Sequence, residues 1–317
     1  MAAYVFRRIL WLGPTLLFIS LITFALMHAI DGGPFDPDKI GVPPERIEAL
    51  NRKYGLDEPV WRQYVDFLAN AVQGDLGISF QRQDKDVTAI IVSKFRVTAV
   101  LGGLTIGLAS VAGVGLGVLA ALHRNRLPDY AGVFFASVGA AVPAFVLGIL
   151  LIYVFAVGLH WLPTGGWDLQ GGMVPGWLPS WRQAILPVIT LAALPTAYLA
   201  RVTRASVLDV LGQDYLRTAR AKGLSERAVF YRHAFRNAVI PILTVVGPLS
   251  AALLTGSFIV EELFSLPGTG RLFVQSVGDR DYGLIMGATI FYGLVIAVAN
   301  LVVDVAYAAV DPRIRYS

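Results

Sequence analysis

Long apolar runs separated by short polar segments dominate the pattern of this chain. Six of them have the length of roughly 20 mostly apolar residues that a helix needs to cross a hydrocarbon core of about 30 Å. Lipid offers no hydrogen-bond partners, so each run is expected to form a helix that satisfies its own backbone groups. The pattern therefore predicts an all-α protein with six transmembrane helices, over residues 9–30, 97–122, 131–159, 184–200, 237–260 and 282–303.

The first run shares one feature with a secretory signal peptide, because Arg7 and Arg8 precede it. Its uncharged stretch is longer than the apolar region of about 7–15 residues in a signal peptide, and no Ala-x-Ala cleavage site follows. We interpret it as a retained transmembrane helix.

Lys and Arg residues predict the orientation, since they accumulate in short cytoplasmic loops. With a cytoplasmic N-terminus, the inner segments hold 14 of them, and eight of these lie in residues 201–236. The two short outer loops hold only Arg182, Arg271 and Arg280. Both termini are therefore expected in the cytoplasm.

This topology divides the chain into residues 1–30, an outer region at 31–96, and a five-helix core at 97–317 that includes the cytoplasmic segment 201–236. In the outer region, apolar residues recur at helical spacing after Pro44 and after Pro59, which predicts two short amphipathic helices. These helices either lie on the membrane surface or cover the other helices, or they form a docking surface for an external partner. The spacing alone does not separate these interpretations.

Glycines and prolines predict how the spans pack. Two pairs of glycines have the G-x-x-x-G spacing that lets helices approach closely, and we interpret them as packing positions: Gly103 with Gly107, and Gly113 with Gly117. Proline removes a backbone donor, and four prolines are expected to bend or interrupt their helices: Pro143, Pro187, Pro195 and Pro241.

Composition excludes several classes of protein. Apolar residues make up 56% of the chain, charged residues only 15%, and the mean hydropathy is +0.63. Soluble domains carry about 25% charged residues, so an ordinary soluble enzyme and a disordered chain are excluded. The net charge of +4 is too small to indicate nucleic-acid binding. The chain has no cysteine, and therefore no disulfide or thiolate site.

The spans contain almost no ionisable groups. Glu261, Glu262 and Asp304 are placed at helix ends, within reach of water or headgroups. A proton- or sodium-coupled transporter usually keeps a charge or a broken-helix site near the midplane, and neither is evident. No lysine follows a glycine in a P-loop pattern, and the four histidines are too dispersed for a metal site. The source of energy is therefore expected outside this chain.

The basic segment 201–236 is too long to be a simple turn. Asp214 is expected to cap a helix that begins near Tyr215 and ends at Gly223, with Leu216 and Ala219 on one face. Ser225 is expected to cap a second helix that leads into the fifth span. The first helix suits insertion into a groove of a partner protein. A basic surface helix on anionic headgroups is an equal alternative on chemistry alone.

The stretch DYLRTARAKGLSERAVFYRHAFRNAVIP, residues 214–241, resembles the cytoplasmic signature of permeases in importers of the ATP-binding-cassette class. The motif glycine corresponds to Gly223 and its third position to Ala219. Arg217 and Thr218 stand where the general motif has Glu and Ala, and the distance from glycine to proline is longer. Both departures are usual in the dipeptide/oligopeptide/nickel branch. YVFRRIL, YGLDEPVWRQY, GDLGISF, GSFIVEELFSLPGTGRLFVQSVGDRDY and DPRIRY extend the resemblance along nearly the whole chain.

The resemblance implies a type I importer permease fold in the cytoplasmic (inner) membrane of a bacterium or archaeon. It implies half of a heterodimeric pore, completed by a second permease, two cytoplasmic ATP-binding subunits and an extracytoplasmic substrate-binding protein. It implies no enzyme activity and no cofactor in this chain, because the partner subunits would bind ATP and Mg²⁺. The residues implied to couple to the ATPase are Asp214, Tyr215, Leu216, Arg217, Thr218, Ala219, Arg220, Ala221, Lys222 and Gly223.

Di- and oligopeptides are the substrates that the resemblance favours, while nickel chelates, glutathione and oligosaccharides stay open. Two hypotheses from other classes also stay open. A self-contained channel or secondary transporter would move its substrate without ATP, and a membrane anchor would only hold a soluble enzyme. The segment 201–236 argues against the first, and six spans with prolines argue against the second.

Overall fold

The computed structural model describes residues 2–30, 32–35, 43–82, 85–167 and 180–310. Five long, apolar helices in these ranges have the length and composition of membrane spans. They are α1 (Ala2–Ala29), α5 (Val87–Leu122), α8 (Trp181–Leu211), α11 (Phe235–Thr255) and α14 (Tyr282–Val310). A bent helix pair brings the candidate spans to six.

Shorter helices connect the spans. At the end that the sequence predicts to face outward, here called the outer end, they are α3 (Pro44–Lys53), α4 (Val60–Val72), α12 (Phe258–Leu263) and α13 (Thr269–Gly278). At the opposite end they are α9 (Asp214–Ala221), α10 (Glu226–Ala228) and the π-helix η2 (Val229–Ala234). The bent pair consists of α6 (Leu127–Ala141) and α7 (Ala144–Leu151), which continues into the π-helix η1 (Ile152–Gly158).

The sequence pattern predicted a single span over residues 131–159. In the structure this region consists of two helices rather than one. It breaks at Pro143, and the two halves meet at 102°. Val142 adopts an extended backbone with φ of −84° and ψ of 121°, the conformation that a following proline favours. The interruption expected at Pro143 is therefore confirmed. Pro187, Pro195 and Pro241 lie inside helices that continue through them.

Among the described helices, α5 and α8 have the most extensive contact, and small residues permit the approach. A Cβ at Gly113 would lie 2.7 Å from Leu199 Cβ, and one at Gly117 would lie 2.5 Å from Ala200 O. This confirms the second glycine pair as packing positions. Gly103 and Gly107 lie on another face of α5, where a Cβ at either position would meet no other part of the described chain within 4 Å.

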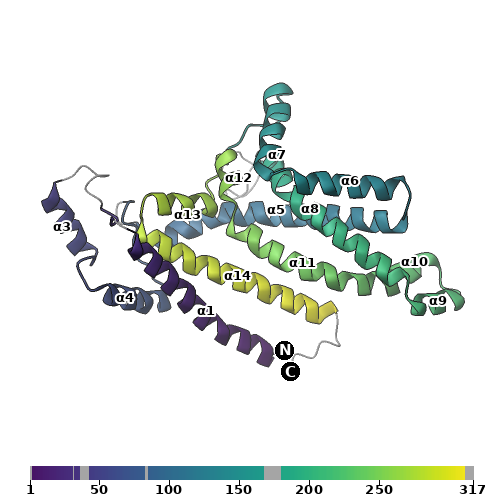
Figure 1. The fold of residues 1–317 in the computed structure, drawn as a ribbon, viewed down its shortest axis with the longest axis horizontal. Coiled ribbons are helices and arrows are strands. Elements are labelled where there is room, and N and C mark those ends of the chain that lie inside the picture. The colour runs from purple at the N-terminus through teal and green to yellow at the C-terminus, as the bar shows by residue number, and fades with distance from the viewer. Residues whose placement is uncertain (1, 31, 36–42, 83–84, 168–179, 311–317) are drawn as a thin grey trace.

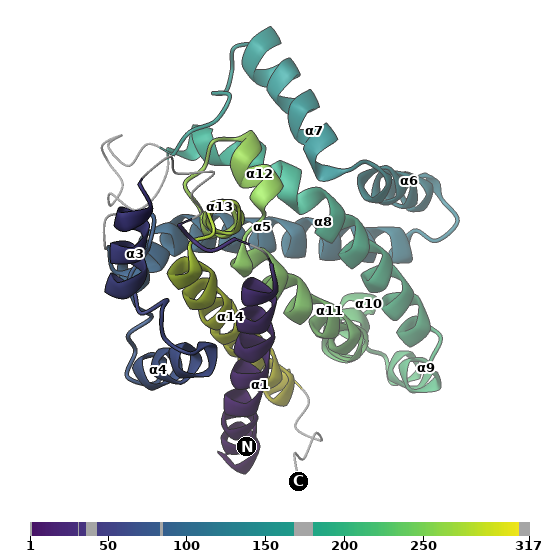
Figure 2. The ribbon, with the colours of Figure 1, turned by 60° about the vertical axis from the view of Figure 1, so that its left-hand side comes forward.

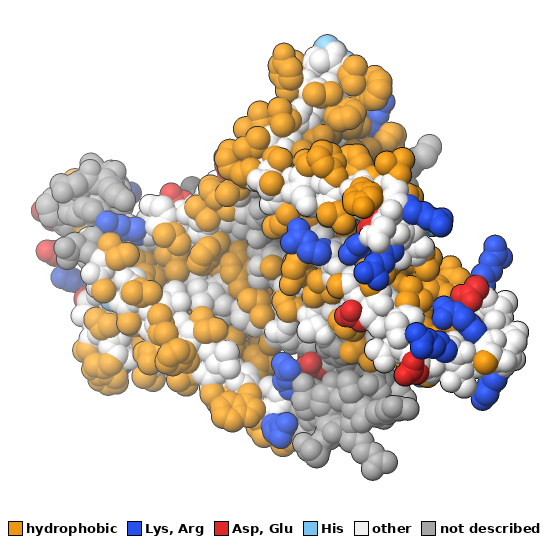
Figure 3. Space-filling view, turned by 45° about the vertical axis from the view of Figure 1, so that its right-hand side comes forward, with side chains coloured by type: hydrophobic (Ala, Val, Ile, Leu, Met, Phe, Trp, Pro, Cys, Tyr) orange, Lys and Arg blue, Asp and Glu red, His pale blue; other side chains and the backbone are white. Residues whose placement is uncertain are grey.

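The first turns of α1 and the last turns of α14 lie toward the end of the molecule that carries α9 and α10. α1 and α14 run side by side in Figures 1 and 2. Arg8 of α1 pairs with Asp304 of α14 at 2.9 Å, near the start of one helix and the end of the other. α3, α4 and α13 lie at the opposite end (Figure 1). Figure 3 shows apolar side chains over most of one face, with Lys and Arg gathered mainly toward α9 and α10.

Candidate functional site

The segment between α8 and α11 forms the two helices that the sequence predicts. α9 ends shortly before Gly223, whose φ of 81° is the left-handed conformation that glycine tolerates at helix ends. Ser225 then caps the following helix, because its Oγ accepts a hydrogen bond from the N–H of Ala228 at 3.4 Å. That helix leads through η2 into α11, so continuous helical backbone joins α10 to a span, and only the turn at Gly223 separates α9 from it.

The start of α9 differs from the expectation that Asp214 is its cap. Gln213 occupies the N-cap position, no side chain caps the helix, and Asp214 is its first residue. The Asp214 carboxylate lies 3.6 Å from the guanidinium of Arg217. A carboxylate in the first turn still faces the positive end of the helix dipole.

The apolar face of α9 is turned toward its own chain. Leu216 is fully buried and Ala219 is 7% exposed. Both belong to an apolar cluster with the inner ends of α5, α8 and α11, formed by Ala121, Val207, Leu216, Ala219, Val229, Phe230, Ala234 and Ala238. Burying a leucine side chain contributes about 1.5–3 kcal/mol. The cluster therefore holds α9 against η2 and the adjoining ends of α5, α8 and α11, an arrangement that we call the clamp.

The surface that α9 presents outward is mostly polar and basic. Arg217, Thr218, Ala221 and Lys222 are exposed, and Tyr215 is partly so. Sequence reasoning gave the helix a partly apolar face for insertion into a partner, but that face packs inward. A partner at this end would instead meet a basic surface with small side chains between the cations.

Hydrogen bonds also tie α9 to the base of α11. Arg220 donates to the carboxylate of Glu226 at 2.9 and 3.4 Å. Asn237 Nδ2 donates to the hydroxyl of Tyr215 at 2.7 Å. These contacts cross the turn at Gly223, so a displacement of α9 would be transmitted to α11.

Glu261 is buried, which corrects the expectation that water or headgroups reach it. Its side chain is fully enclosed. The carboxylate accepts hydrogen bonds from Thr98 Oγ1 at 2.9 Å and from the N–H of Arg271 at 2.8 Å. Burial raises the pKa of Glu261, and these hydrogen bonds oppose the shift. Glu262, its neighbour, is exposed and pairs with Arg271 at 2.8 Å.

Three glycines surround the Glu261 carboxylate. A Cβ at Gly256 would lie 2.7 Å from Oε1, and one at Gly270 would lie 3.2 Å from Oε2. A Cβ at Gly268 would overlap the carboxylate itself. Glycine is therefore required at these positions, because a side chain there would collide with the Glu261 carboxylate. The cluster of glycines near Glu261 is the one signal in the sequence that could have indicated its burial. That network connects α12 and α13 to Thr98 of α5.

A second buried carboxylate joins two segments about 200 residues apart. Asp281, 1% exposed, accepts hydrogen bonds from the hydroxyl of Ser79 and from the N–H of Phe80, the latter at 3.0 Å. It also accepts from the N–H of Leu284 in the first turn of α14. The GDLGISF and VGDRDY motifs thus meet at the outer end of α14, a contact that sequence reasoning missed.

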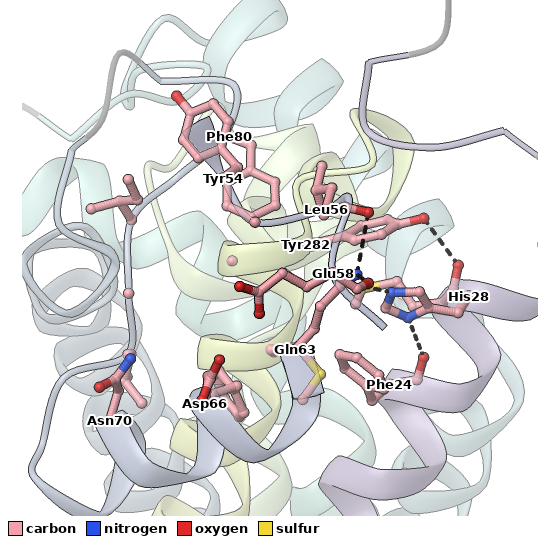
Figure 4. A pocket seen from close by; sticks show the side chains of 18 of the residues that line it. Phe24, His28, Tyr54, Leu56, Glu58, Gln63, Asp66, Asn70, Phe80 and Tyr282 are labelled. Carbon is pink, nitrogen blue, oxygen red and sulfur yellow. Dashed lines mark hydrogen bonds between the residues drawn. The ribbon is translucent and has the colours of Figure 1, made fainter. Parts of the chain in front are cut away.

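An outer pocket of about 400 Å³ lies beside this junction, between α1, α4 and the start of α14. Figure 4 shows Tyr54 and Phe80 on one side of it and Asp66 and Asn70 on the other, with the Glu58 carboxylate between them. Sequence reasoning did not find this pocket, because its residues come from four separate segments. Among the described residues, no group of three or more histidines and carboxylates could hold a metal ion.

The family model described as binding-protein-dependent transport system inner membrane component matches residues 113–316. A companion model for the N-terminal part of the same membrane component matches residues 1–102. The chain belongs to this permease family. The resemblance drawn from residues 214–241 is thereby confirmed.

Relatives of the permease match along its whole length. It is 44% identical over 320 residues to the glutathione transport system permease protein GsiC of Escherichia coli O6:H1, strain CFT073. It is 40% identical over 316 residues to the oligopeptide transport system permease protein OppB of Salmonella typhimurium, strain LT2. In both cases the match covers 100% of each chain.

Solved structures confirm the fold of the permease. An amino acid ABC transporter with histidines matches with a TM-score of 0.52 and 18% identity, over 70% of this chain and 94% of that one. The methionine ABC transporter MetNI, in an inward-facing form, matches with a TM-score of 0.53 and 14% identity, over 70% and 96%. At these identities the likeness shows the fold alone. The coupling role of residues 214–223 stays a prediction.

Proposed function

We propose that the permease forms half of the translocation pore of an ATP-driven importer for small peptides, glutathione among them. The observation that carries the proposal is the clamp between α9 and the inner ends of α5, α8 and α11. A rigid helix, exposed on one side and held by three spans on the other, is suited to pass a movement of an ATPase to the pore.

The proposed mechanism is a population shift. Two cytoplasmic ATPase subunits close on ATP, and one of them carries α9 with it. The spans then change from inward-facing to outward-facing, and an external binding protein releases its cargo into the pore. Changing a 1:99 ratio of two states to 99:1 takes about 5.5 kcal/mol of differential binding. ATP binding on the partners, rather than a charge inside this chain, would supply that energy.

A second permease subunit would complete the pore, and α5 offers a face for it. Leu104, Leu108 and Val111 are exposed there, beside the uncovered Gly103 and Gly107. These positions recur at helical spacing on one side of α5, opposite the glycines that pack on α8. Small residues let a partner helix approach closely, which favours this face as the contact between the two permeases.

The peptide substrate is inferred from the relatives. One of them is named for glutathione transport, a tripeptide, and the other for oligopeptide transport. The alternative is that the same kind of importer carries a nickel chelate or an oligosaccharide instead of a peptide. We place the assembly in a bacterial cytoplasmic membrane, with both termini of the permease on the cytoplasmic side.

The test is purification of the tagged permease from its native membrane in a mild detergent, followed by reconstitution into liposomes. We expect a second permease and P-loop ATPases to co-purify, and uptake of radiolabelled glutathione or tri-alanine to require ATP and the binding protein. Uptake by the permease alone, without ATP, would contradict the proposal and favour a self-contained transporter. ATP-dependent uptake of a nickel chelate but of neither peptide would overturn the choice of substrate.

A further inference from the structure

A groove lies between α5, α6 and α8, toward the end of the molecule that carries α9. Its volume is about 230 Å³, and Leu116, Val133 and Ala205 lie along it. α6 runs beside α8 at the edge of the molecule in Figure 2. The described residues that line the groove are all Gly, Ala, Val or Leu, except for Arg201 and Arg204. The groove therefore combines an apolar channel with two cations.

Small residues keep the groove open. They are Gly117 and Ala120 of α5, Gly132 and Ala136 of α6, and Ala200 of α8. A Cβ at Gly132 would lie 3.5 Å from the Cβ of Ala120, an ordinary van der Waals distance, so α5 and α6 do not close on each other there. Pockets that enclose a whole small ligand usually measure about 300–1,000 Å³. This smaller groove suits one segment of a long apolar chain.

The walls of the groove belong to the membrane-spanning part of the permease. Leu116 and Val133 lie within apolar runs that the sequence predicts to cross the hydrocarbon core. Val133 is 47% exposed, and its neighbours Phe134 and Phe135 are 62% and 66% exposed. Exposed apolar side chains in a membrane span are typical of a side that meets lipid. The occupant of the groove is therefore expected to come from the membrane.

Arg201 brings a charge to the groove that the chain does not neutralise. It directly follows the apolar run that ends at Ala200, which places it at the level of the lipid headgroups. Arg201 is exposed and forms no ion pair with any carboxylate of the described residues. The turn between α5 and α6 adds Arg124 and Arg126, which are exposed as well. Basic pockets between spans on the cytoplasmic side favour anionic headgroups.

Arg204 is held in a fixed position one helical turn further along α8. Its Nε and Nη2 donate to the carboxylate of Asp129 on α6, the latter at 2.8 Å. Asp129 is 2% exposed and does not line the groove. A guanidinium has five donors, and the other three have no partner among the described residues. Arg204 thus offers oriented donors, while Arg201 supplies the net positive charge.

The second permease subunit is the competing occupant of the groove. The face of α5 proposed for that subunit carries Gly103 and Gly107, whereas the groove uses Leu116, Gly117 and Ala120, nearer the other end of the helix. A phospholipid carries a phosphate and apolar chains on one molecule, and arginine binds phosphate through several parallel hydrogen bonds. An anionic lipid therefore matches the arginines and the apolar channel together.

We propose that this groove binds an anionic phospholipid, with its phosphate against Arg201 and Arg204 and one acyl chain between α5, α6 and α8. The site goes beyond the proposed function, because it concerns the membrane around the permease and not the cargo. The proposed orientation assigns the lipid to the inner leaflet. Ala120 of the groove directly precedes Ala121 of the clamp, so the bound lipid would support the part of the permease that holds α9.

The test uses the assembled transporter in nanodiscs. The probes are phosphatidylglycerol and phosphatidylcholine with the same diazirine in one acyl chain, each added at the same low fraction, and mass spectrometry identifies the labelled residues. We expect phosphatidylglycerol to label Leu116, Val133 or Ala205 at least fivefold more than phosphatidylcholine does. Equal labelling by the two lipids, or labelling only outside the groove, would overturn the proposal.

Two variants with the same change in charge test the headgroup contact. Arg201→Gln should reduce the preference for phosphatidylglycerol about fivefold, the effect expected of one cation near anionic lipid. Arg227→Gln changes an exposed arginine outside the groove and should keep the wild-type preference. Arg204 stays intact in both variants, because its removal would leave the carboxylate of Asp129 buried without its cation. Equal preferences in the two variants would overturn the proposal.

A second pair of variants tests the place of the acyl chain. Ala205→Trp fills the groove from an exposed position of α8 and should reduce labelling of Leu116 and Val133 by phosphatidylglycerol. Ala140→Trp is the same change at an exposed position of α6 outside the groove, and should leave that labelling unchanged. Unchanged labelling in Ala205→Trp would show that the chain lies elsewhere and that the proposal is wrong.

Two further measurements distinguish the lipid from other occupants. Soluble glycerol phosphate should not displace the photoreactive phosphatidylglycerol, and displacement would make the ligand a soluble anion. Val133→Cys should form no bismaleimide cross-link to single cysteines placed along the second permease. Such a cross-link would assign the groove to that subunit. Either result would overturn the proposal, and neither depends on whether the assembled transporter imports peptides.

Discussion

At the scale of single residues, two buried carboxylates, Glu261 and Asp281, hold the outer loops against the spans. The sequence analysis placed Glu261 within reach of water and did not single out Asp281. Glu261 lies in a short outer helix, yet it is enclosed by glycines and by Thr98 of α5. Asp281 plays the same part for the loop at Ser79. Each buried carboxylate accepts hydrogen bonds from backbone N–H groups and from hydroxyl side chains, in place of the hydrogen bonds that water would supply. These bonds let irregular loops pack against the ends of the spans.

The buried carboxylate of Glu261 predicts a dependence of stability on pH. Its pKa is raised above the ordinary value of 4.5 by burial, so the folded state holds the proton more tightly than the unfolded state. Its contribution to the free energy of unfolding is therefore fully present below about pH 4.5 and is lost as pH rises through the raised pKa.

Thermal unfolding of the wild type and Glu261→Gln between pH 4.5 and 8 measures this contribution. We expect the advantage of the wild type over the variant to shrink as pH rises. Glu262→Gln is the matched control, since its carboxylate is 48% exposed, and it should show no comparable trend. A difference between wild type and Glu261→Gln that grows with pH would contradict the assignment.

At the scale of helices, α9 is stabilised by packing on its neighbours rather than by its own length. It has only eight residues, and isolated helices of that length are unstable in water. Packing of Leu216 and Ala219 on three spans supplies the stability that its sequence lacks. The same packing would let α9 move together with the spans in the proposed mechanism.

Ala219→Leu is expected to uncouple transport from ATP hydrolysis. Ala219 is 7% exposed, and an enlarged side chain in a packed cluster costs about 1–3 kcal/mol, enough to move α9 off the spans. The measurement is uptake per ATP hydrolysed in proteoliposomes. Ala69→Leu, the same change at an exposed position of α4, should keep the wild-type ratio. Wild-type coupling in Ala219→Leu would show that the clamp has no mechanical role.

A substitution at Gly223 tests the turn after α9 separately. Its φ of 81° strains any residue with a Cβ, although no atom lies within 4 Å of the site. Gly223→Leu is therefore expected to reduce coupling through the backbone and not through a clash. Gly212→Leu, at a φ of −79°, is the control for an added side chain without that strain. Equal coupling in the two variants would exclude a role for the turn.

α4 also carries an apolar side that the protein does not cover. Trp61, Val65 and Val72 are 69%, 51% and 88% exposed, and they follow helical spacing. The neighbouring helix α1 exposes Phe18 and Leu21 in the same way. We predict that this side of α4 lies in the outer leaflet as a continuation of the lipid-facing side of α1.

Spin labels can measure the environment of α4, because the chain has no native cysteine. Nitroxides at Val65→Cys and Val72→Cys should be accessible to oxygen in nanodiscs, and those at Asp66→Cys and Asn70→Cys to a water-soluble nickel complex. Accessibility at 65 and 72 to the nickel complex, lost on adding the binding protein, would favour the docking surface instead.

At the scale of the whole molecule, the single chain leaves apolar surfaces for lipid or a partner subunit to cover. α5 packs on α8 and α11 with one set of glycines and exposes Gly103 and Gly107 on the other side. α7 projects away from the bundle in Figures 1 and 2, and Phe145 and Ile149 on it are exposed. These features suit a subunit whose partner contributes the other half of a pore.

The face of α5 predicts the position of the second permease. In the purified transporter, Gly107→Cys should form a cross-link with a bismaleimide to a cysteine on the facing helix of the second permease, in a band with the mass of two permeases. Phe18→Cys, 62% exposed on α1, should not, because we expect it to face lipid. The reverse result would move the contact between permeases to α1.

The sequence by itself determined the elements that depend on neighbouring residues. Five spans, the break at Pro143, the helix ending before Gly223 and the cap at Ser225 all follow from apolar length, backbone restriction or local hydrogen bonding. These signals act within a few residues, so they can be read without a fold. The helix at Asp214–Ala221 was predicted for the same reason, and its coupling role stays a prediction.

Only the tertiary structure decided which residues meet across long distances in the chain. Thr98 meets Glu261 across 163 residues, and Ser79 meets Asp281 across 202. Which glycine pair packs, which face of α9 is buried, and where the outer pocket lies depend on the same long-range contacts. Helical spacing shows that residues share a face, but the partner helix determines whether that face is covered by protein, lipid or water.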